Sequence, residues 1–154
     1  MLIEFQKDNR HYEGFLADNA HLSVKSLDEF RGRYTQMTMG LHLNGTSIGT
    51  GGLMRWRGAS TKEYLQTEST GLYRGYRKKG HGIILYIFLI ETARILGAKR
   101  IYSSRSLNKL SRHMWADKLS QIYNVKKIPG RCNRCGRPFK HFTKPVYFID
   151  LQEK

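Results

Sequence analysis

The feature that most constrains this chain is a long apolar stretch, Ile83 to Leu96, which follows a loop rich in glycine and lysine. Apolar residues occupy nearly every side of this stretch for about four turns, which predicts a buried helix. Gly97 suits the left-handed position that often ends a helix. The uninterrupted apolar run from Ile83 to Ile90 is far shorter than the roughly 20 residues that span a bilayer.

The loop before this helix, Arg77 to Gly82, has the composition of an anion-binding site. The first N–H groups of a helix lack partners within it, and the helix dipole adds partial positive charge there. Glycine allows a phosphate to approach the main chain closely, and Arg77, Lys78 and Lys79 add full charges. The alternative is a basic surface turn that only leads into a core helix. His81 is expected either to touch a nucleotide or to lie in solvent.

Strand patterns lie on both sides of the predicted helix. Residues 35–43 alternate with a period of roughly two, and Asn44-Gly45 is a hairpin signal. Further strands are expected at 46–56 and 63–73, which makes an antiparallel meander. A strand, the helix and another strand in sequence imply a parallel pair with a right-handed crossover. The other expected elements are helices at 21–33 and 111–119, and strands at 99–104, 122–127 and 145–151.

Length and charge bound the organisation of the chain. A chain of 154 residues and 17.9 kDa suits a single domain over residues 1–154. Residues 1–70 carry 8 basic and 8 acidic side chains, so the net charge of +15 comes entirely from residues 71–154, with 19 basic and 4 acidic. The second half is therefore expected to face something anionic.

The compartment is predicted from cysteine content and the N-terminal residues. Cys132 and Cys135 are the only cysteines and lie too close together to staple a fold, which argues against a secreted disulfide scaffold. The first residues lack the apolar core of a signal peptide. We expect a cytoplasmic protein without a membrane segment.

The order of these elements resembles the Gcn5-related N-acetyltransferase (GNAT) superfamily. Its pyrophosphate-binding signature, Arg/Gln-x-x-Gly-x-Gly/Ala between the fourth strand and the third helix, is matched by residues 77–82. The family then has an asparagine after the fifth strand, a small residue three positions later and an apolar-aromatic pair. This spacing is matched by Asn108, Ser111, Met114 and Trp115.

The resemblance covers about residues 35–125 and the closing strand. It implies an α/β (α+β) fold with a mixed, mostly antiparallel sheet of six to seven strands and about four flanking helices. It also implies direct transfer of an acetyl group from acetyl-coenzyme A to an amine within a ternary complex.

Each part of the implied coenzyme site has a physical reason. The loop amides would hold the pyrophosphate, and pantetheine would pair with the edge of a strand that a bulge splays from its neighbour. An N–H near Leu72 would polarise the thioester carbonyl, a contact typically worth about 2.7–4 kcal/mol. The residues expected to bind the coenzyme are Leu72, Tyr73, Arg77, Lys78, Lys79, Gly80, His81, Gly82, Asn108, Ser111 and Trp115.

Attack on the thioester requires a neutral amine. At pH 7 this costs roughly 4.6 kcal/mol for a lysine with a pKa near 10.4, but only about 1.4 kcal/mol for an α-amine. The candidate base is Glu68, four residues before Leu72, and Glu63 is the next choice. The alternative for Glu68 is an exposed strand carboxylate.

The proton donor is less clearly indicated. The family often has a tyrosine where this chain has Trp115, which is expected to pack on pantetheine or in the core. Tyr123, Tyr102, Ser111 or solvent remain as donors, and Tyr123 is our prediction beside Glu68. The α-amine, which needs the least help, is a suitable acceptor.

Residues 126–144 contain seven Lys or Arg and no acid. Within them, Cys132-x-x-Cys135 resembles half of a zinc knuckle, with His141 as a third ligand. The fourth ligand would be His113, His42 or a residue of a neighbouring molecule. A free dithiol in a turn and a redox pair are the alternatives.

Basic and aromatic residues alternate in the same segment, which suits a nucleic-acid backbone. The expected patch is Lys126, Lys127, Arg131, Arg134, Arg137 and Lys140. The alternatives are that these charges attract only the coenzyme phosphates or keep the protein in solution. Two rival functions remain at this point: a degenerate GNAT-fold nucleic-acid-binding module, and an acetyltransferase for an amine linked to nucleic acid, such as aminoacyl-tRNA. A homodimer is a further expected assembly.

Overall fold

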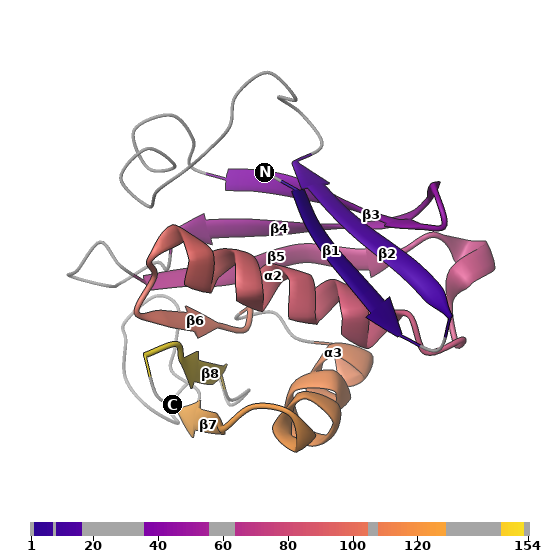
Figure 1. Ribbon diagram of the computed structural model, residues 1–154. Coiled ribbons are helices and arrows are strands. Elements are labelled where there is room, and N and C mark those ends of the chain that lie inside the picture. The colour runs from indigo at the N-terminus through magenta and orange to yellow at the C-terminus, as the bar shows by residue number, and fades with distance from the viewer. Residues whose placement is uncertain are drawn as a thin grey trace.

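The computed structural model describes residues 2–7, 9–16, 36–55, 64–104, 108–128 and 146–152. Their strands form one eight-stranded sheet in the order β1-β2-β3-β4-β5-β6-β8-β7. Helix α2 packs against β4 and β5, near the middle of the sheet, as Figure 1 shows. No helix in the described residues is long and apolar enough to cross a membrane.

From β3 onward the elements follow the predicted order. The strands are β1 (Leu2–Lys7), β2 (Arg10–Leu16), β3 (Gln36–Leu43), β4 (Thr46–Arg55), β5 (Tyr64–Leu72), β6 (Arg100–Tyr102), β7 (Val125–Ile128) and β8 (Val146–Asp150). The helical segments are the 3₁₀ turn η1 (Arg74–Tyr76), α2 (Gly82–Leu96), α3 (Lys109–His113), the π-helical turn η2 (Met114–Lys118) and the 3₁₀ turn η3 (Leu119–Gln121).

Strands β1 to β5 form a continuous antiparallel meander. Asn44 and Gly45 join β3 to β4 with φ angles of 48° and 85°, the left-handed pair that a two-residue hairpin turn requires. Gly97 likewise has a φ of 95° at the end of α2. The local signals for these turns therefore predicted the backbone correctly.

The count of elements needs correction. Strands β1 and β2 lie in a part of the sequence that had no clear strand pattern, and they raise the sheet to eight strands rather than six or seven. The described residues contain two α-helices, α2 and α3, against about four expected. The helix expected at residues 21–33 lies outside the described residues.

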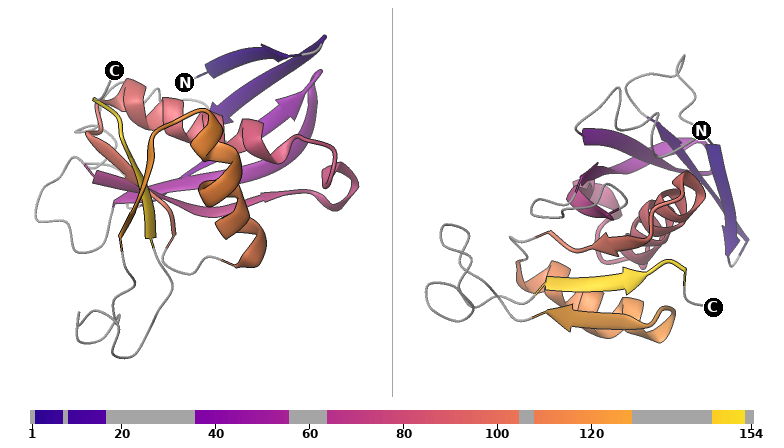
Figure 2. Two further views of the ribbon diagram at one scale, coloured as in Figure 1. Left: turned by 90° about the horizontal axis from the view of Figure 1, so that it is seen from below. Right: turned by 90° about the vertical axis from the view of Figure 1, so that its left-hand side faces the viewer.

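The crossover and the predicted splay are both present. Strand β5 pairs in parallel with β6 only from Tyr64 to Gln66, after which β5 continues to Leu72 without β6. After Tyr102 the chain follows β8 instead, and Ser103 N donates to Tyr147 O at 2.8 Å. Figure 2 shows β6 and β8 diverging from the long strands of the meander.

A bulge in β5 lies within the splayed region. Gly52 pairs with Glu68 but Thr50 pairs with Gly71, so Ser69 and Thr70 together oppose Gly51. An extra residue bends its strand and increases the local twist. The bulge therefore turns the free part of β5 away from β6 just before the loop that leads into α2.

The core forms beneath α2, and glycine lets the helix approach the sheet. A Cβ built on Gly14 of β2 would lie 2.8 Å from Phe88 Cδ1, and one on Gly51 of β4 would lie 2.9 Å from Leu89 Cδ1. Side chains at these positions would push the helix away. At the other side of α2, Trp115 is fully buried with its ring 6.0 Å from that of Tyr86 in an edge-on contact.

Trp115→Ala is expected to lower the free energy of unfolding by about 3–5 kcal/mol, because it leaves a large cavity in a closed core. Urea denaturation followed by circular dichroism measures the change. Leu110→Ala is the control, since Leu110 on α3 is 78% exposed, and it should change stability by less than about 0.5 kcal/mol. Equal losses in the two variants would show that Trp115 does not anchor the core.

Candidate functional site

The loop between β5 and α2 has an unusual backbone. Lys78 has a φ of 62° and Gly80 a φ of 84°, both in the left-handed region. For lysine this conformation costs on the order of 1–2 kcal/mol, and such residues concentrate at functional turns. Turns with left-handed residues form concave surfaces of main-chain N–H groups that bind anions. The local geometry is therefore that of an anion site.

The start of α2 adds to this site. The carbonyl of His81 accepts the first bonds of the helix, from Ile84 N at 3.1 Å and Leu85 N at 3.4 Å. The amides of Gly82 and Ile83 precede these bonds, and His81 supplies no side-chain cap. Their N–H groups are therefore available to an anion, and the helix dipole favours one there.

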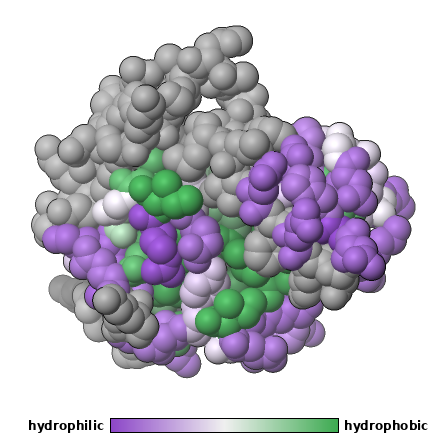
Figure 3. Space-filling view, viewed as in Figure 1, coloured by the Kyte–Doolittle hydropathy of each residue, from purple (hydrophilic) through white to green (hydrophobic). Residues whose placement is uncertain are grey.

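Full charges surround the same loop. Arg74, Arg77, Lys78 and Lys79 are all exposed. The end of the molecule that carries η1 and the β3–β4 turn is predominantly hydrophilic in Figure 3. No described heavy atom lies within 4 Å of a Cβ built on the exposed Gly80, so this position opens onto free space. These residues fit a diphosphate.

The side chain of His81 is buried. It is only 4% exposed, and Nδ1 lies 2.9 Å from the hydroxyl of Tyr12 on β2. The expectation of a solvent-exposed loop histidine was therefore wrong, because the ring turns inward, whereas a contact between His81 and the coenzyme stays a prediction. Burial, reinforced by the positive charges of Arg10 and Lys79, lowers the pKa of His81. The sequence had no signal for Tyr12, which is 69 positions away.

The end of β5 presents a free main-chain donor. Tyr73 N donates to Ile48 O of β4 at 2.9 Å. Because successive residues of a strand direct their N–H groups to opposite sides, the N–H of Leu72 points away from β4, toward the edge that β6 has left. Tyr73 is 47% exposed at the same place. The donor role of Leu72 toward a thioester stays a prediction.

Glu68 lies in the splayed part of β5, and its side chain is half-buried rather than fully exposed. Gln66 Nε2 donates to Glu68 Oε2 at 2.8 Å, and Gln66 itself is only 5% exposed. The neighbouring Leu65 packs in the core beneath α2, so Gln66 and Glu68 share the opposite face of the sheet. The carboxylate is thus held in one orientation beside the gap. Glu63 lies outside the described residues.

Tyr123 is hydrogen-bonded to an acidic side chain of α2. Its hydroxyl donates to Glu91 Oε1 at 2.8 Å. Burial and the Glu91 carboxylate raise the pKa of Tyr123, which makes it a weaker acid. Its role as proton donor stays a prediction.

The residues that match the family spacing around α3 have different partners in the structure. Asn108 Oδ1 accepts from Ser111 N at 2.8 Å, so Asn108 caps α3. The hydroxyl of Ser111 bonds to that of Tyr86, one turn into α2, and burial raises the pKa of Tyr86. Trp115 packs in the core, and its zero exposure opposes the predicted coenzyme contact. In the sequence, the only indication that Tyr86 has a polar partner is that a tyrosine stands among leucines and isoleucines.

The basic segment is only partly described. Lys126 Nζ lies 2.8 Å from Asp150 Oδ2, and Arg100 Nε lies 2.6 Å from Asp150 Oδ1. Lys126 is therefore paired with an acid rather than offered to a nucleic acid, which corrects its place in the patch, whereas Lys127 is exposed. The other predicted residues lie outside the described residues: Arg131, Arg134, Arg137, Lys140, Cys132, Cys135 and His141.

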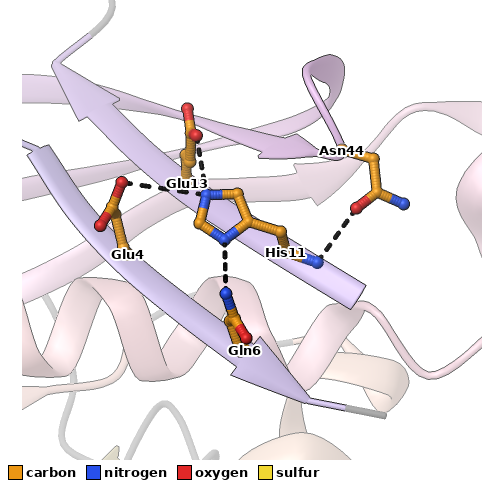
Figure 4. A network of polar contacts seen from close by, with 5 residues as sticks. All are labelled: Glu4, Gln6, His11, Glu13 and Asn44. Atoms are coloured by element: carbon orange, nitrogen blue, oxygen red, sulfur yellow. Dashed lines mark hydrogen bonds and ion pairs between the residues drawn. The ribbon is translucent and has the colours of Figure 1, made fainter. Parts of the chain in front are cut away.

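A polar cluster joins the first two strands at their turn (Figure 4). His11 Nε2 lies 2.8 Å from Glu13 Oε1 and 3.9 Å from Glu4 Oε1. Gln6 Nε2 contacts the other ring nitrogen at 3.5 Å, and His11 N donates to Asn44 Oδ1 at 3.0 Å. These contacts tie β1 to β2 and both to the β3–β4 turn, so the cluster stabilises the hairpin that carries Tyr12.

Known proteins resemble this chain in structure rather than in sequence. No family model matches it, and no curated protein matches its sequence. A putative acyl-CoA N-acyltransferase from Klebsiella pneumoniae superposes with a TM-score of 0.56 at 12% identity, over 91% of this chain and 97% of its own. A putative acetyltransferase from Salmonella typhimurium, solved with its cofactor acetyl-CoA, has a TM-score of 0.54 at 20% identity, over 82% and 70% of the two chains.

This chain has the GNAT fold. A ribosomal-protein-alanine N-acetyltransferase from Brucella melitensis also matches, with a TM-score of 0.52 at 19% identity, over 79% of this chain and 71% of its own. The residues that match the family signature in the sequence, 77–82, lie in this structure between β5 and α2.

The buried imidazole makes stability depend on pH. The pKa of His81 is lowered in the folded state from its usual value near 6.5, so the unfolded chain binds more protons as the pH falls. The stability from the neutral ring is present above about pH 6.5 and is lost below it. The melting temperature should therefore fall more from about pH 7.5 to 5.5 in the wild type than in His81→Asn, measured by circular dichroism without ligand. Identical pH profiles would show that His81 does not titrate as a buried group.

Proposed function

We propose that this GNAT-fold chain is an N-acetyltransferase that transfers the acetyl group of acetyl-coenzyme A to an amine in a ternary complex. The observation that carries the proposal is the basic, left-handed loop at the start of α2, which follows a strand that, among the described strands, has no partner on the β6 side beyond Gln66. A diphosphate site joined to an unpaired strand edge suits a ligand with an anionic end and an extended amide-containing arm.

The residues that would hold the coenzyme follow from this geometry. The main-chain N–H groups of residues 77–83 would bind the diphosphate, and Arg74, Lys78 and Lys79 would add charge. The free edge of β5 would pair with the amides of pantetheine. When bound, the coenzyme supplies an acetyl group activated as a thioester.

Two groups of β5 would assist the transfer. The N–H of Leu72 would donate to the thioester carbonyl, where such a contact is typically worth about 2.7–4 kcal/mol. Glu68, held by Gln66, would accept a proton from the acceptor amine. An amine with a pKa near 8 requires less deprotonation than a lysine, so an α-amine is the acceptor class we propose.

The chain needs no strong acid for the departing thiol. A thiol with a pKa near 8.5 leaves readily as a thiolate at neutral pH, and solvent can then protonate it. This removes the need for Tyr123, whose hydroxyl donates to Glu91 of α2, and for an acid at Trp115. The rival function, a nucleic-acid module, rests on residues 131–140, and no observation on the described residues favours it.

Gly80→Glu is expected to abolish coenzyme A binding, because it places a negative charge in the anion site and a side chain at a φ of 84°. Isothermal titration of the folded protein with coenzyme A measures the loss. Gln121→Glu adds the same charge at an exposed position on η3 and should bind like the wild type. Binding by Gly80→Glu at wild-type affinity would refute the loop as the diphosphate site.

Glu68→Gln is expected to lower kcat by about 10²- to 10⁴-fold, the usual contribution of a general base, and to leave the Kd for coenzyme A unchanged. Release of free thiol, followed with a panel of peptides, polyamines and aminoacyl-tRNA, gives the rate. A full rate in Glu68→Gln would exclude this carboxylate as the base.

A further inference from the structure

We propose that Tyr12 and His81 are positioning residues that hold the phosphate loop in its binding shape by fastening it to the sheet. The inference rests on the proposed function, because it concerns the same loop, but it assigns a role to a residue outside the loop. Tyr12 lies on β2, and the side chain of His81 carries the only ring in residues 77–82.

Few contacts hold the loop. Within the described part of the chain, two side-chain hydrogen bonds reach residues 77–81: Arg77 Nε donates to Leu72 O at 3.0 Å, and Tyr12 Oη meets His81 Nδ1 at 2.9 Å. The first bond ties the loop back to the strand from which it emerges. The second is the one that ties it to a different part of the sheet.

The contact with Tyr12 is built into the core. Tyr12 is 1% exposed and His81 is 4% exposed, so water does not compete for this hydrogen bond. The two rings meet edge-on with centroids 5.9 Å apart, and the ring centroid of Tyr76 lies 6.5 Å from that of His81. The hydrogen bond and these two aromatic neighbours together restrict the imidazole.

Strand β2 is a firm anchor for the loop. It is paired on both sides, with β1 from Arg10 to Phe15 and with β3 from Tyr12 to Leu16. Tyr12 packs with Phe88 and Leu85 of α2 in one cluster. The hydrogen bond thus fixes the loop relative to both the sheet and the helix whose N–H groups face the anion.

Holding the loop before binding has a defined consequence for affinity. A loop that is already in the bound shape loses less conformational entropy when the ligand arrives, so the ligand binds more tightly. The chemical step does not use these side chains. Loss of the anchor should therefore raise the Kd and the KM for the coenzyme without lowering kcat at saturating coenzyme.

The test begins with Tyr12→Phe, which removes one hydroxyl and keeps the ring. Isothermal titration with coenzyme A should show a Kd raised by roughly 2- to 10-fold, the range expected for one hydrogen bond. The control is Tyr147→Phe, which removes a hydroxyl from another buried tyrosine on β8, away from the loop. This control should keep the wild-type Kd.

A double-mutant cycle separates the pair from general loss of packing. His81→Leu should weaken binding, and the variant that combines it with Tyr12→Phe should bind no more weakly than His81→Leu alone, because both changes remove one contact. His81→Asn, which can place a polar atom near the position of Nδ1, should recover part of the affinity. Independent, additive losses would overturn the inference.

Failure of the inference and failure of the proposed function give different results. A wild-type Kd in Tyr12→Phe, with or without a lower melting temperature, overturns the positioning role and leaves the coenzyme site standing. A fall in kcat with an unchanged KM also overturns it. If the wild-type protein binds no coenzyme A, the proposed function itself is overturned.

Discussion

The close packing of α2 on the sheet is the constraint on which the rest of this structure depends. The helix can approach only because Gly14 and Gly51 leave room for Phe88 and Leu89. Once its apolar residues are buried there, its first turn must lie where β5 ends. The N–H groups of that turn have no partners within the helix, and they directly follow the loop of residues 77–81. The helix that buries apolar side chains in the core therefore also presents main-chain N–H groups at its first turn.

The second constraint on the arrangement of the candidate site is that the pairing of β5 with β6 ends early, at Gln66. In a fully paired sheet, the N–H of Leu72 and the side chain of Glu68 would lie beside another strand. Here β6 turns toward β8 after Tyr102, and the bulge at Ser69 and Thr70 bends β5 the other way. Unpaired main-chain groups in a sheet are normally a liability. Here the part of β5 beyond Gln66 lacks β6 as a partner and carries a carboxylate held by Gln66, which is the arrangement on which the proposed function rests.

The positive charges of the second half of the chain do not all serve one purpose. Arg100 and Lys126 share the carboxylate of Asp150, and the Arg100 guanidinium also lies 4.4 Å from the ring centre of Phe148. These cations help to join β6, β7 and β8. The cations of the loop have no such acid beside them among the described residues, and Arg77 uses one of its nitrogens on a main-chain carbonyl. Net charge alone could not make this distinction.

Local chemistry explains which predictions succeeded from the sequence. The Asn44-Gly45 turn, the Gly97 helix end, the apolar α2 and the loop before it all depend on residues within a few positions of one another, so the order of residues determined them. Strands β1 and β2 were missed, since their pairing partners, rather than a local pattern, define them. The direction of His81, the orientation of Glu68 and the hydrogen bond of Tyr123 to Glu91 were decided only by tertiary structure. Each depends on a partner distant along the chain or on which face of the sheet is buried, and no single stretch of sequence contains that information.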